Sequence, residues 1–137
     1  MPTTQMRMKE DSSVRERIET LAQAIRDKDV EALMTHYAPD VVVYDVMPPL
    51  DVQSAAAYRE NFERWFASME GPIGYEMNDM RLSMGESHAM CHCKSHITGK
   101  KKNGENMDYW VRVTTFFQKA NGQWLVGHEH VSMPATM

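Results

Sequence analysis

The stretch Trp124-Leu-Val-Gly-His-Glu-His-Val-Ser-Met-Pro134 follows the dipeptide Asn121-Gly122, with one residue between them. Asn-Gly accepts the positive φ values of a tight hairpin, so the stretch is predicted as a strand ending near residue 132. Side chains alternate between the two faces of a strand. One face is therefore expected to carry Trp124, Val126, His128 and His130. If that face lines a cavity, its indole and imidazole rings contact a ligand.

The segments before this hairpin also read as strands. Three more are predicted, over residues 75–84, 88–98 and 105–118, with the turn signal Gly85-Glu86-Ser87 after the first and the loop Gly99–Gly104 after the second. Strands that follow one another through short turns form an antiparallel meander. The C-terminal half is therefore predicted to be an antiparallel β-sheet.

The N-terminal half has the three- and four-residue periodicity of helices. Ser13 and Glu16 form a capping box at the start of an amphipathic helix that ends near residues 27–28. Asp29 is the expected N-cap of a short helix over residues 30–37, and Ser54 that of a third helix ending near residue 69. A short strand over residues 41–46 separates the second helix from the third.

This order of elements predicts one α+β domain. Three N-terminal helices are expected to pack on one face of a curved antiparallel β-sheet. Residues 1–12 are expected to form a flexible tail and residues 13–134 the domain. No internal repeat or linker divides the chain.

The composition excludes some partners. The chain has 137 residues, 42% apolar and 25% charged, and a formal net charge of −4. This charge argues against nucleic-acid binding, and Lys100-Lys101-Lys102 is interpreted as a solvated hairpin tip. No apolar run approaches the roughly 20 residues of a membrane span, and the N-terminus lacks the apolar core of a signal peptide. No membrane association and a cytoplasmic location are therefore expected, and two cysteines do not suggest a disulfide framework.

The order of helices and strands resembles the cone-shaped NTF2-like superfamily. Within it, the chain is most similar to the SnoaL-like, ketosteroid-isomerase-related proteins. The resemblance implies a cone with an apolar pocket and a homodimer formed through the open sheet face. No cofactor is expected, because the sequence has no Gly-rich phosphate loop and no nucleotide fingerprint. The residues that carry it are His36–Asp45 with Pro48-Pro49, Asn61–Phe66, Arg112–Thr115, Asn121–Trp124, and His128–His130 with Ser132 and Pro134.

The comparison with ketosteroid isomerases is informative where it fails. The resemblance places Asp45 at the position of their general base. It places Leu21 where they have a hydrogen-bonding tyrosine, and Thr114 near their second donor. Because most of the oxyanion hole is missing, steroid isomerisation is not expected.

Several side chains are candidates for a pocket. Asp45 ends an apolar strand, where it could act as a general base or cap a turn. If Thr114 lines the pocket, as the resemblance implies, Arg112 lies on the same inward face. A buried guanidinium needs a partner, which could be Asp45, Asp108 or a ligand carboxylate. Tyr58, Phe62, Trp65 and Phe66 are interpreted as core under the sheet. Aromatic walls of the pocket could nonetheless come from Tyr44, Trp65, Trp110 and Trp124.

The histidines allow different interpretations. His128 and His130 could bind a metal together with a third ligand, such as His36 or Asp45, could hydrogen-bond a ligand, or could be structural. His88, His92 and His96 are spaced by four residues, roughly 13 Å along a strand, which is too far for a shared ion. They are expected on an exposed or dimer-facing surface, with Cys91 and Cys93 on the opposite face.

The leading hypothesis is a protein that binds a small hydrophobic, carbonyl or carboxylate ligand, with possible isomerase or lyase activity. Asp45 is the candidate base, with His128, His130 and Arg112 orienting the ligand. No metal site is assigned. One alternative is a non-catalytic ligand-binding or dimeric assembly module, and another is a metal-dependent enzyme that uses His128 and His130.

Overall fold

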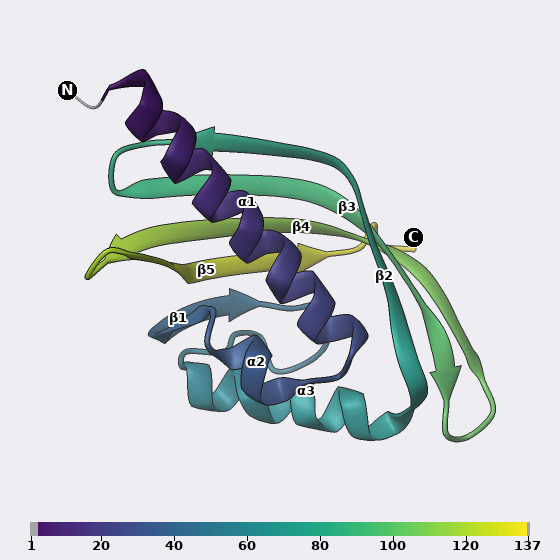
Figure 1. Cartoon of the computed structure of the whole chain (residues 1–137). Helices are drawn as coiled ribbons and strands as arrows, with labels where there is room; N and C mark the ends of the chain where they lie inside the picture. The colour runs from purple at the N-terminus through teal and green to yellow at the C-terminus, as the bar shows by residue number, and fades with distance from the viewer. Residues whose placement is uncertain (1–2, 137) are drawn as a thin grey trace.

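A long first helix crosses the concave face of a strongly bent sheet in the computed structural model, which describes residues 3–136 (Figure 1). A third helix closes one end of the space beneath the sheet, beside the first strand. The elements are α1 (Thr4–Arg26), α2 (Val30–Met34), β1 (Tyr37–Tyr44), α3 (Ala55–Ser68), β2 (Met69–Met84), β3 (His88–Lys101), β4 (Asn106–Ala120) and β5 (Gln123–Ser132).

The five strands form one sheet in the order β1-β5-β4-β3-β2. The β2–β3, β3–β4 and β4–β5 pairs are antiparallel, as the hairpin signals predicted. The edge strand β1 instead pairs with β5 in parallel. The sheet is therefore mixed, and the prediction of a purely antiparallel sheet was wrong at this edge. The pairing of β1 with the last strand is a long-range contact without a local turn signal.

The first helix is longer than predicted. It begins at Thr4, because the Thr3 hydroxyl caps it by accepting a hydrogen bond from the backbone N–H of Met6 at 3.1 Å. Ser13, the predicted cap, lies within the helix and donates to the carbonyl of Lys9. Residues 4–12, predicted as part of a flexible tail, are helical, and residues 1–2 of that tail lie outside the described residues.

The other two helices begin where their caps were predicted. Asp29 accepts a hydrogen bond from the N–H of Ala32, and Ser54 accepts one from Ala57, each at 3.1 Å. Helix α2 has only five residues and ends at Met34, so it is shorter than predicted. Helix α3 follows β1, so only α1 and α2 precede the sheet.

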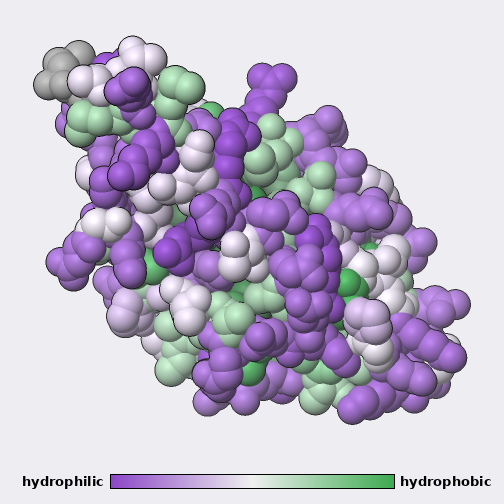
Figure 2. Space-filling view, in the orientation of Figure 1, coloured by the Kyte–Doolittle hydropathy of each residue, from purple (hydrophilic) through white to green (hydrophobic). Residues whose placement is uncertain are grey.

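The apolar core lies between the helices and the inner face of the sheet. Seen from the side of α1, the surface is mostly hydrophilic, with small apolar patches (Figure 2). No helix within residues 3–136 is long and apolar enough to cross a membrane. The buried side chains of the two long helices include Val14, Ile18, Leu21 and Ile25 of α1 and Tyr58, Phe62 and Phe66 of α3.

A β-bulge in β5 decides which of its side chains point inward. Phe116 of β4 pairs with His128, but the next residue, Phe117, pairs with Val126, so Gly127 is an extra residue in β5. A bulge of this kind shifts the alternation of the strand by one residue. Trp124 and Val126 are buried before the bulge, and Glu129 is buried after it.

Candidate functional site

A cavity of about 540 Å³ lies between the bent sheet, the helices and the loop that follows β1. This volume is within the range of small-molecule sites, roughly 300–1,000 Å³. Its walls are largely apolar and aromatic, and the polar groups are few. Leu21 and Ile25 line it from α1, Phe62 and Trp65 from α3, and Ile97, Met107, Val111 and Val113 from the sheet.

Asp45 lies at the cavity wall, where β1 gives way to the loop. Val41 and Val43 are fully buried, and Asp45 follows them at two-residue spacing, so its side chain is directed to the same face. Its Oδ1 accepts a hydrogen bond from the backbone N–H of Val46 at 2.7 Å. Burial nevertheless raises the pKa of Asp45, because an apolar surrounding disfavours the ionised carboxylate.

Glu129 is a second carboxyl group in the same cavity, and it is only 5% exposed. The hydroxyl of Tyr58 donates to Oε1 at 2.7 Å, that of Tyr37 approaches the same oxygen at 3.4 Å, and that of Thr115 donates to Oε2 at 3.1 Å. Burial raises the pKa of Glu129 more than these hydroxyl contacts lower it, and Asp45 adds to the increase. The hydroxyl contacts therefore fix the orientation of the carboxyl group, and its burial favours the protonated form.

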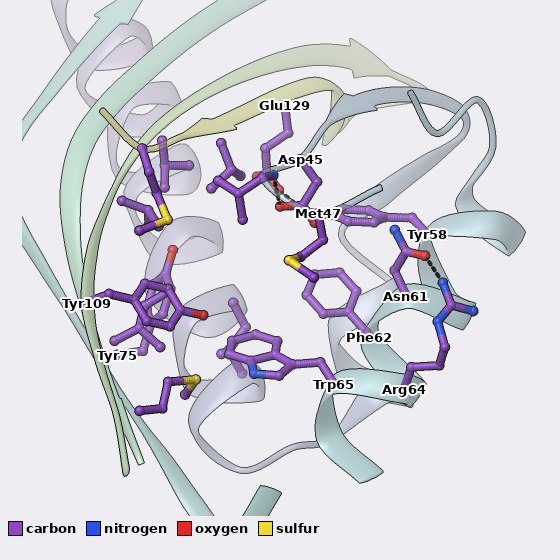
Figure 3. Close-up of a pocket in the computed structure, with 18 of the residues that line it drawn as sticks. Asp45, Met47, Tyr58, Asn61, Phe62, Arg64, Trp65, Tyr75, Tyr109 and Glu129 are labelled. Atoms are coloured by element: carbon purple, nitrogen blue, oxygen red, sulfur yellow. Dashed lines mark hydrogen bonds between the residues drawn. The ribbon is translucent and has the colours of Figure 1, made fainter. Parts of the chain in front are cut away.

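The two carboxyl groups share one side of the cavity. Figure 3 shows Asp45 directly below Glu129, with Tyr109 and Tyr75 across the open space and Trp65 closing it below. The negative charge of Asp45 raises the pKa of Tyr109, although burial is the larger cause. Two carboxyl groups in an apolar wall resist simultaneous ionisation, so one of them tends to hold a proton.

Polar residues from α3 and β3 line another part of the cavity. Asn61, Arg64 and Ser68 come from α3, and Lys101 is the last residue of β3. Arg64 is exposed and Lys101 is partly exposed, so they mark a mouth open to solvent. The guanidinium of Arg64 donates to the amide oxygen of Asn61.

The predicted histidine pair lies on the other face of the sheet. His128 is partly buried against Phe116, and its Nδ1 lies 2.7 Å from the carbonyl oxygen of Val42. His130 is exposed, and Tyr44 contacts both histidine rings edge-on. The bulge at Gly127 causes this reversal, because it turns the histidines outward and Glu129 inward.

The face of β4 that was predicted to line the pocket, with Trp110, Arg112 and Thr114, lies on the outer side of the sheet. Trp110 is 50% exposed and stacks on His96, which in turn contacts Asp108 at 2.7 Å. Arg112 is exposed and donates to the hydroxyl of Ser132, so it meets neither Asp45 nor the cavity. The predicted orientation of this face was therefore wrong. The inward side chains are the odd-numbered ones: Met107, Tyr109, Val111, Val113, Thr115 and Phe117.

Three further predicted site residues have separate outcomes. Trp65 lines the cavity, as one of the two interpretations of its aromatic cluster expected. Trp124 is buried away from the cavity lining, and its indole N–H donates to Glu10 at 2.8 Å. Thr114 is partly buried on the outer face, opposite His130 in the β4–β5 ladder.

Sequence reasoning missed the most enclosed polar group of the cavity. Glu129 was assigned to the face opposite the histidines, and Tyr58 was interpreted as core. One local signal could have found Glu129, because a glycine inside a strand often marks a bulge, and Gly127 lies between the two alternation frames. Tyr58 carried no local signal, because its partner is 71 residues away in the chain.

Metal binding by the histidine pair has no support from the geometry. Within residues 3–136, no group of three His, Cys, Asp or Glu side chains could hold a metal ion. His36, named as a third ligand, lies beside Arg17, whose Nη1 is 2.8 Å from its Nδ1. Burial, with a smaller contribution from Arg17, lowers the pKa of His36 to about 4.

Known proteins resemble this chain in sequence and fold. A family model described as SnoaL-like domain matches residues 14–136. An NTF2-like protein of unknown function from Pseudomonas putida KT2440 is 28% identical, with a TM-score of 0.86 over 95% of this chain and 90% of that one. None of the curated proteins compared matches the sequence.

Two other solved structures share the fold at lower identity. A candidate scytalone dehydratase from Novosphingobium aromaticivorans DSM 12444 is 13% identical, with a TM-score of 0.84 over 96% of this chain and 89% of that one. A ketosteroid isomerase-like protein from Erwinia carotovora atroseptica SCRI1043 is 15% identical, with a TM-score of 0.76 over 88% and 93%.

Proposed function

The chain belongs to the SnoaL-like domain family, and from this membership and the cavity geometry we propose that it binds an apolar carbonyl compound and transfers a proton on it. Asp45 is the base, and the reaction is an isomerisation or an elimination. The observation that supports this proposal most directly is a carboxyl group with a raised pKa at the wall of a largely apolar cavity. Structures of similar fold named for dehydratase and isomerase chemistry are consistent with it.

Asp45 has the properties of a general base for a carbon acid. Burial raises the pKa of Asp45. The carboxylate is therefore a stronger base, closer in basicity to the enolate that forms when a carbon acid loses its proton. The backbone N–H of Val46 fixes one carboxyl oxygen, so the other is left to accept a proton from the ligand. The surrounding walls are largely apolar, which strengthens each electrostatic interaction with the reacting group.

Glu129 is the proposed hydrogen-bond donor to the developing oxyanion, and Tyr58 holds it in place. When Asp45 is ionised, its charge favours the protonated form of Glu129. A protonated carboxyl group donates a hydrogen bond to a carbonyl oxygen and stabilises an enolate. In an elimination Glu129 instead gives its proton to the hydroxyl group, which leaves as water, while Asp45 removes the α-proton. Tyr58 positions Glu129 through the 2.7 Å hydrogen bond.

Hydrogen–deuterium exchange at carbon tests this proposal without knowledge of the physiological substrate. α-Tetralone and cyclohex-2-enone are incubated with the protein in D₂O, and loss of the acidic C–H signals is followed by ¹H NMR. Wild-type protein is expected to accelerate exchange of at least one ketone. Asp45→Asn should lower that rate by about 10²-fold or more, the usual contribution of a positioned base.

The matched control is Asp108→Asn, which changes an exposed aspartate on the outer face of the sheet. It should leave the exchange rate unchanged. Acceleration that survives in Asp45→Asn would contradict the role of this base. Absence of acceleration by the wild-type protein with both ketones would contradict proton transfer from a carbonyl ligand.

A homodimer is a second proposal, for assembly rather than chemistry. The outer face of the sheet exposes Trp110, Phe116 and Tyr44 by 50%, 45% and 43%, and helices cover only the opposite face. Exposed aromatic residues on one face are typical of protein interfaces. Sedimentation equilibrium should give a dimer mass for wild-type protein and a monomer for Phe116→Asp. A monomeric wild-type protein at micromolar concentration would contradict the proposal.

A further inference from the structure

The cavity has two chemically different regions. Asp45 and Glu129 supply acidic groups on one side, and Arg64 and Lys101 supply cationic groups at the mouth. In Figure 3 the side chain of Arg64 lies apart from both carboxyl groups, beyond Asn61. A molecule in this cavity therefore meets an electrostatic gradient, from positive at the mouth to acidic at the inner wall.

Two separate elements bring the cations to the mouth. The backbone N–H of Lys102 donates to the carbonyl of Ser68 at 2.9 Å, which fastens the β3–β4 hairpin to the end of α3. Lys101 also pairs with Met69 in the β2–β3 ladder. These contacts hold Lys101 on the same cavity as Arg64. The basic run Lys100-Lys101-Lys102 is thus more than a solvated tip, because its middle residue lines the site.

The charges at the mouth are only loosely compensated. The partner of the Arg64 guanidinium is the neutral amide oxygen of Asn61. The ammonium group of Lys101 lies 3.8 Å from Glu105, which is longer than a charge-assisted hydrogen bond. Among the described residues, neither cation lies within hydrogen-bond distance of a carboxylate, so both remain available to a ligand anion.

We propose that the ligand is an amphipathic oxyanion, with a carboxylate, sulfonate or phosphate at Arg64 and Lys101 and a neutral ring-sized body inside the cavity. This proposal rests on the proposed binding function and extends it to a ligand class. The acidic groups of the inner wall repel the anionic group of the ligand. That group therefore stays at the mouth, and the uncharged end of the ligand reaches Asp45. The gradient thereby selects the orientation that brings the reactive carbon to the base.

Trp65 and Tyr109 contribute the shape that this ligand needs. They face the open space from α3 and β4, with Phe62 beside Trp65 (Figure 3). Flat aromatic surfaces accommodate a fused or planar ring body. The cavity volume of about 540 Å³ accommodates a bicyclic or tricyclic skeleton.

A matched pair of fluorescent probes tests the charge requirement. 8-Anilinonaphthalene-1-sulfonate and N-phenyl-1-naphthylamine share one ring system and differ by the sulfonate. Wild-type protein should bind the sulfonate at least about threefold more tightly, with weaker binding at high salt, as expected for a partly exposed ion pair. Arg64→Gln and Lys101→Gln should each weaken sulfonate binding about three- to fivefold and leave the neutral probe unchanged.

Two control variants locate the effect. Arg112→Gln removes an exposed cation from the outer face of the sheet and should change neither affinity. Ser68→Trp places a large side chain at the mouth from an exposed position and should abolish binding of both probes. Equal affinity of wild-type protein for the two probes would overturn the proposal. Binding that survives in Ser68→Trp would overturn it as well, because the probes would then occupy another site.

Competition identifies the anion. 2-Naphthoate and 2-naphthyl phosphate should each displace the bound sulfonate probe, and the stronger competitor names the preferred oxyanion. The uncharged 2-naphthamide should compete less well than 2-naphthoate, and equal competition would contradict the charge requirement. Asp45→Asn separates this proposal from the proposed chemistry, because it should lose proton exchange and keep the preference for the sulfonate probe.

Discussion

Asp45 directly follows β1 and reaches the cavity beside Glu129 of β5, because Val43, two residues before Asp45, pairs with Glu129 in the parallel β1–β5 ladder. The two carboxyl groups therefore share a wall although 84 positions separate them in the chain. The negative charge of Asp45 raises the pKa of Glu129, so the protonation of one depends on that of the other.

Glu129→Gln is expected to change how stability depends on pH. Burial raises the pKa of Glu129, so the folded protein keeps a proton on this carboxyl group at pH values where an exposed glutamate is ionised. The native state then binds more protons than the unfolded state, so the free energy of unfolding falls as pH rises through the folded pKa. Urea unfolding between pH 4 and pH 9 measures this dependence. The free energy of unfolding should fall less with rising pH for Glu129→Gln than for wild-type protein. Identical slopes would show that Glu129 titrates normally, and Glu105→Gln, an exposed site, is the control.

Tyr58→Phe should destabilise the fold and raise the pKa of Glu129 further. The lost hydroxyl donates to Glu129 at 2.7 Å and lowers the pKa of that carboxyl group. Leaving a buried acceptor without one of its donors costs about 1–3 kcal/mol of unfolding free energy. Chemical denaturation at pH 7 measures this cost. Tyr44→Phe on the outer face should stay within about 0.5 kcal/mol of wild type, and an equal loss in both variants would argue against a special role for Tyr58.

His36→Leu should remove part of the acid sensitivity. The ring is 5% exposed, its Nε2 has no hydrogen-bond partner within residues 3–136, and its pKa is lowered to about 4, chiefly by burial. Between pH 6.5 and about pH 4 the unfolded chain binds more protons at this site, so the unfolding free energy falls as the pH falls.

The shift of the His36 pKa from 6.5 to about 4 corresponds to roughly 3 kcal/mol of acid-dependent stability. The unfolding free energy is measured against pH for both proteins. The difference between wild type and His36→Leu should fall as the pH falls from 6.5 to about 4. His88→Leu changes an exposed histidine and should leave the profile of the wild type intact. If the difference for His36→Leu does not change with pH, the pKa of His36 is the same in the folded and unfolded states, which would contradict the prediction.

Glu10→Ala should loosen the first turns of α1. Glu10 accepts hydrogen bonds from the indole N–H of Trp124 and the ammonium of Lys119, each at 2.8 Å. Loss of these contacts should cost about 1 kcal/mol and increase amide exchange in residues 4–12. Exchange followed by mass spectrometry, with the exposed Glu16→Ala as control, measures the difference. Rapid exchange of these residues already in the wild type would support the flexible tail that the sequence predicts.

Local signals predicted much of the fold. Asp29 and Ser54 cap helices because side-chain caps depend on neighbouring residues alone. Strand β3 has its predicted faces, with Cys91 and Cys93 buried and His92 exposed, because its alternation is uninterrupted there. The parallel β1–β5 pairing could not be predicted in this way, since no short turn joins these strands.

The candidate site was harder to predict, because it depends on which face of a strand turns inward. Asp45 and Trp65 were identified, and both line the cavity. On β4 both faces carry bulky residues, such as Trp110 outside and Val111 inside, so alternation gave two possible orientations. The resemblance selected the wrong one through Thr114, and the true orientation follows from pairing with β3 and β5.

The extra residue at Gly127 gives β5 two alternation frames in one short sequence. In one frame the strand would enclose two imidazoles, and in the other it encloses a carboxyl group. The position of a single glycine therefore selects between a basic and an acidic interior without any substitution of the residues that carry the chemistry. A shift of that glycine by insertion and deletion would be a short route by which such a scaffold acquires a different reaction.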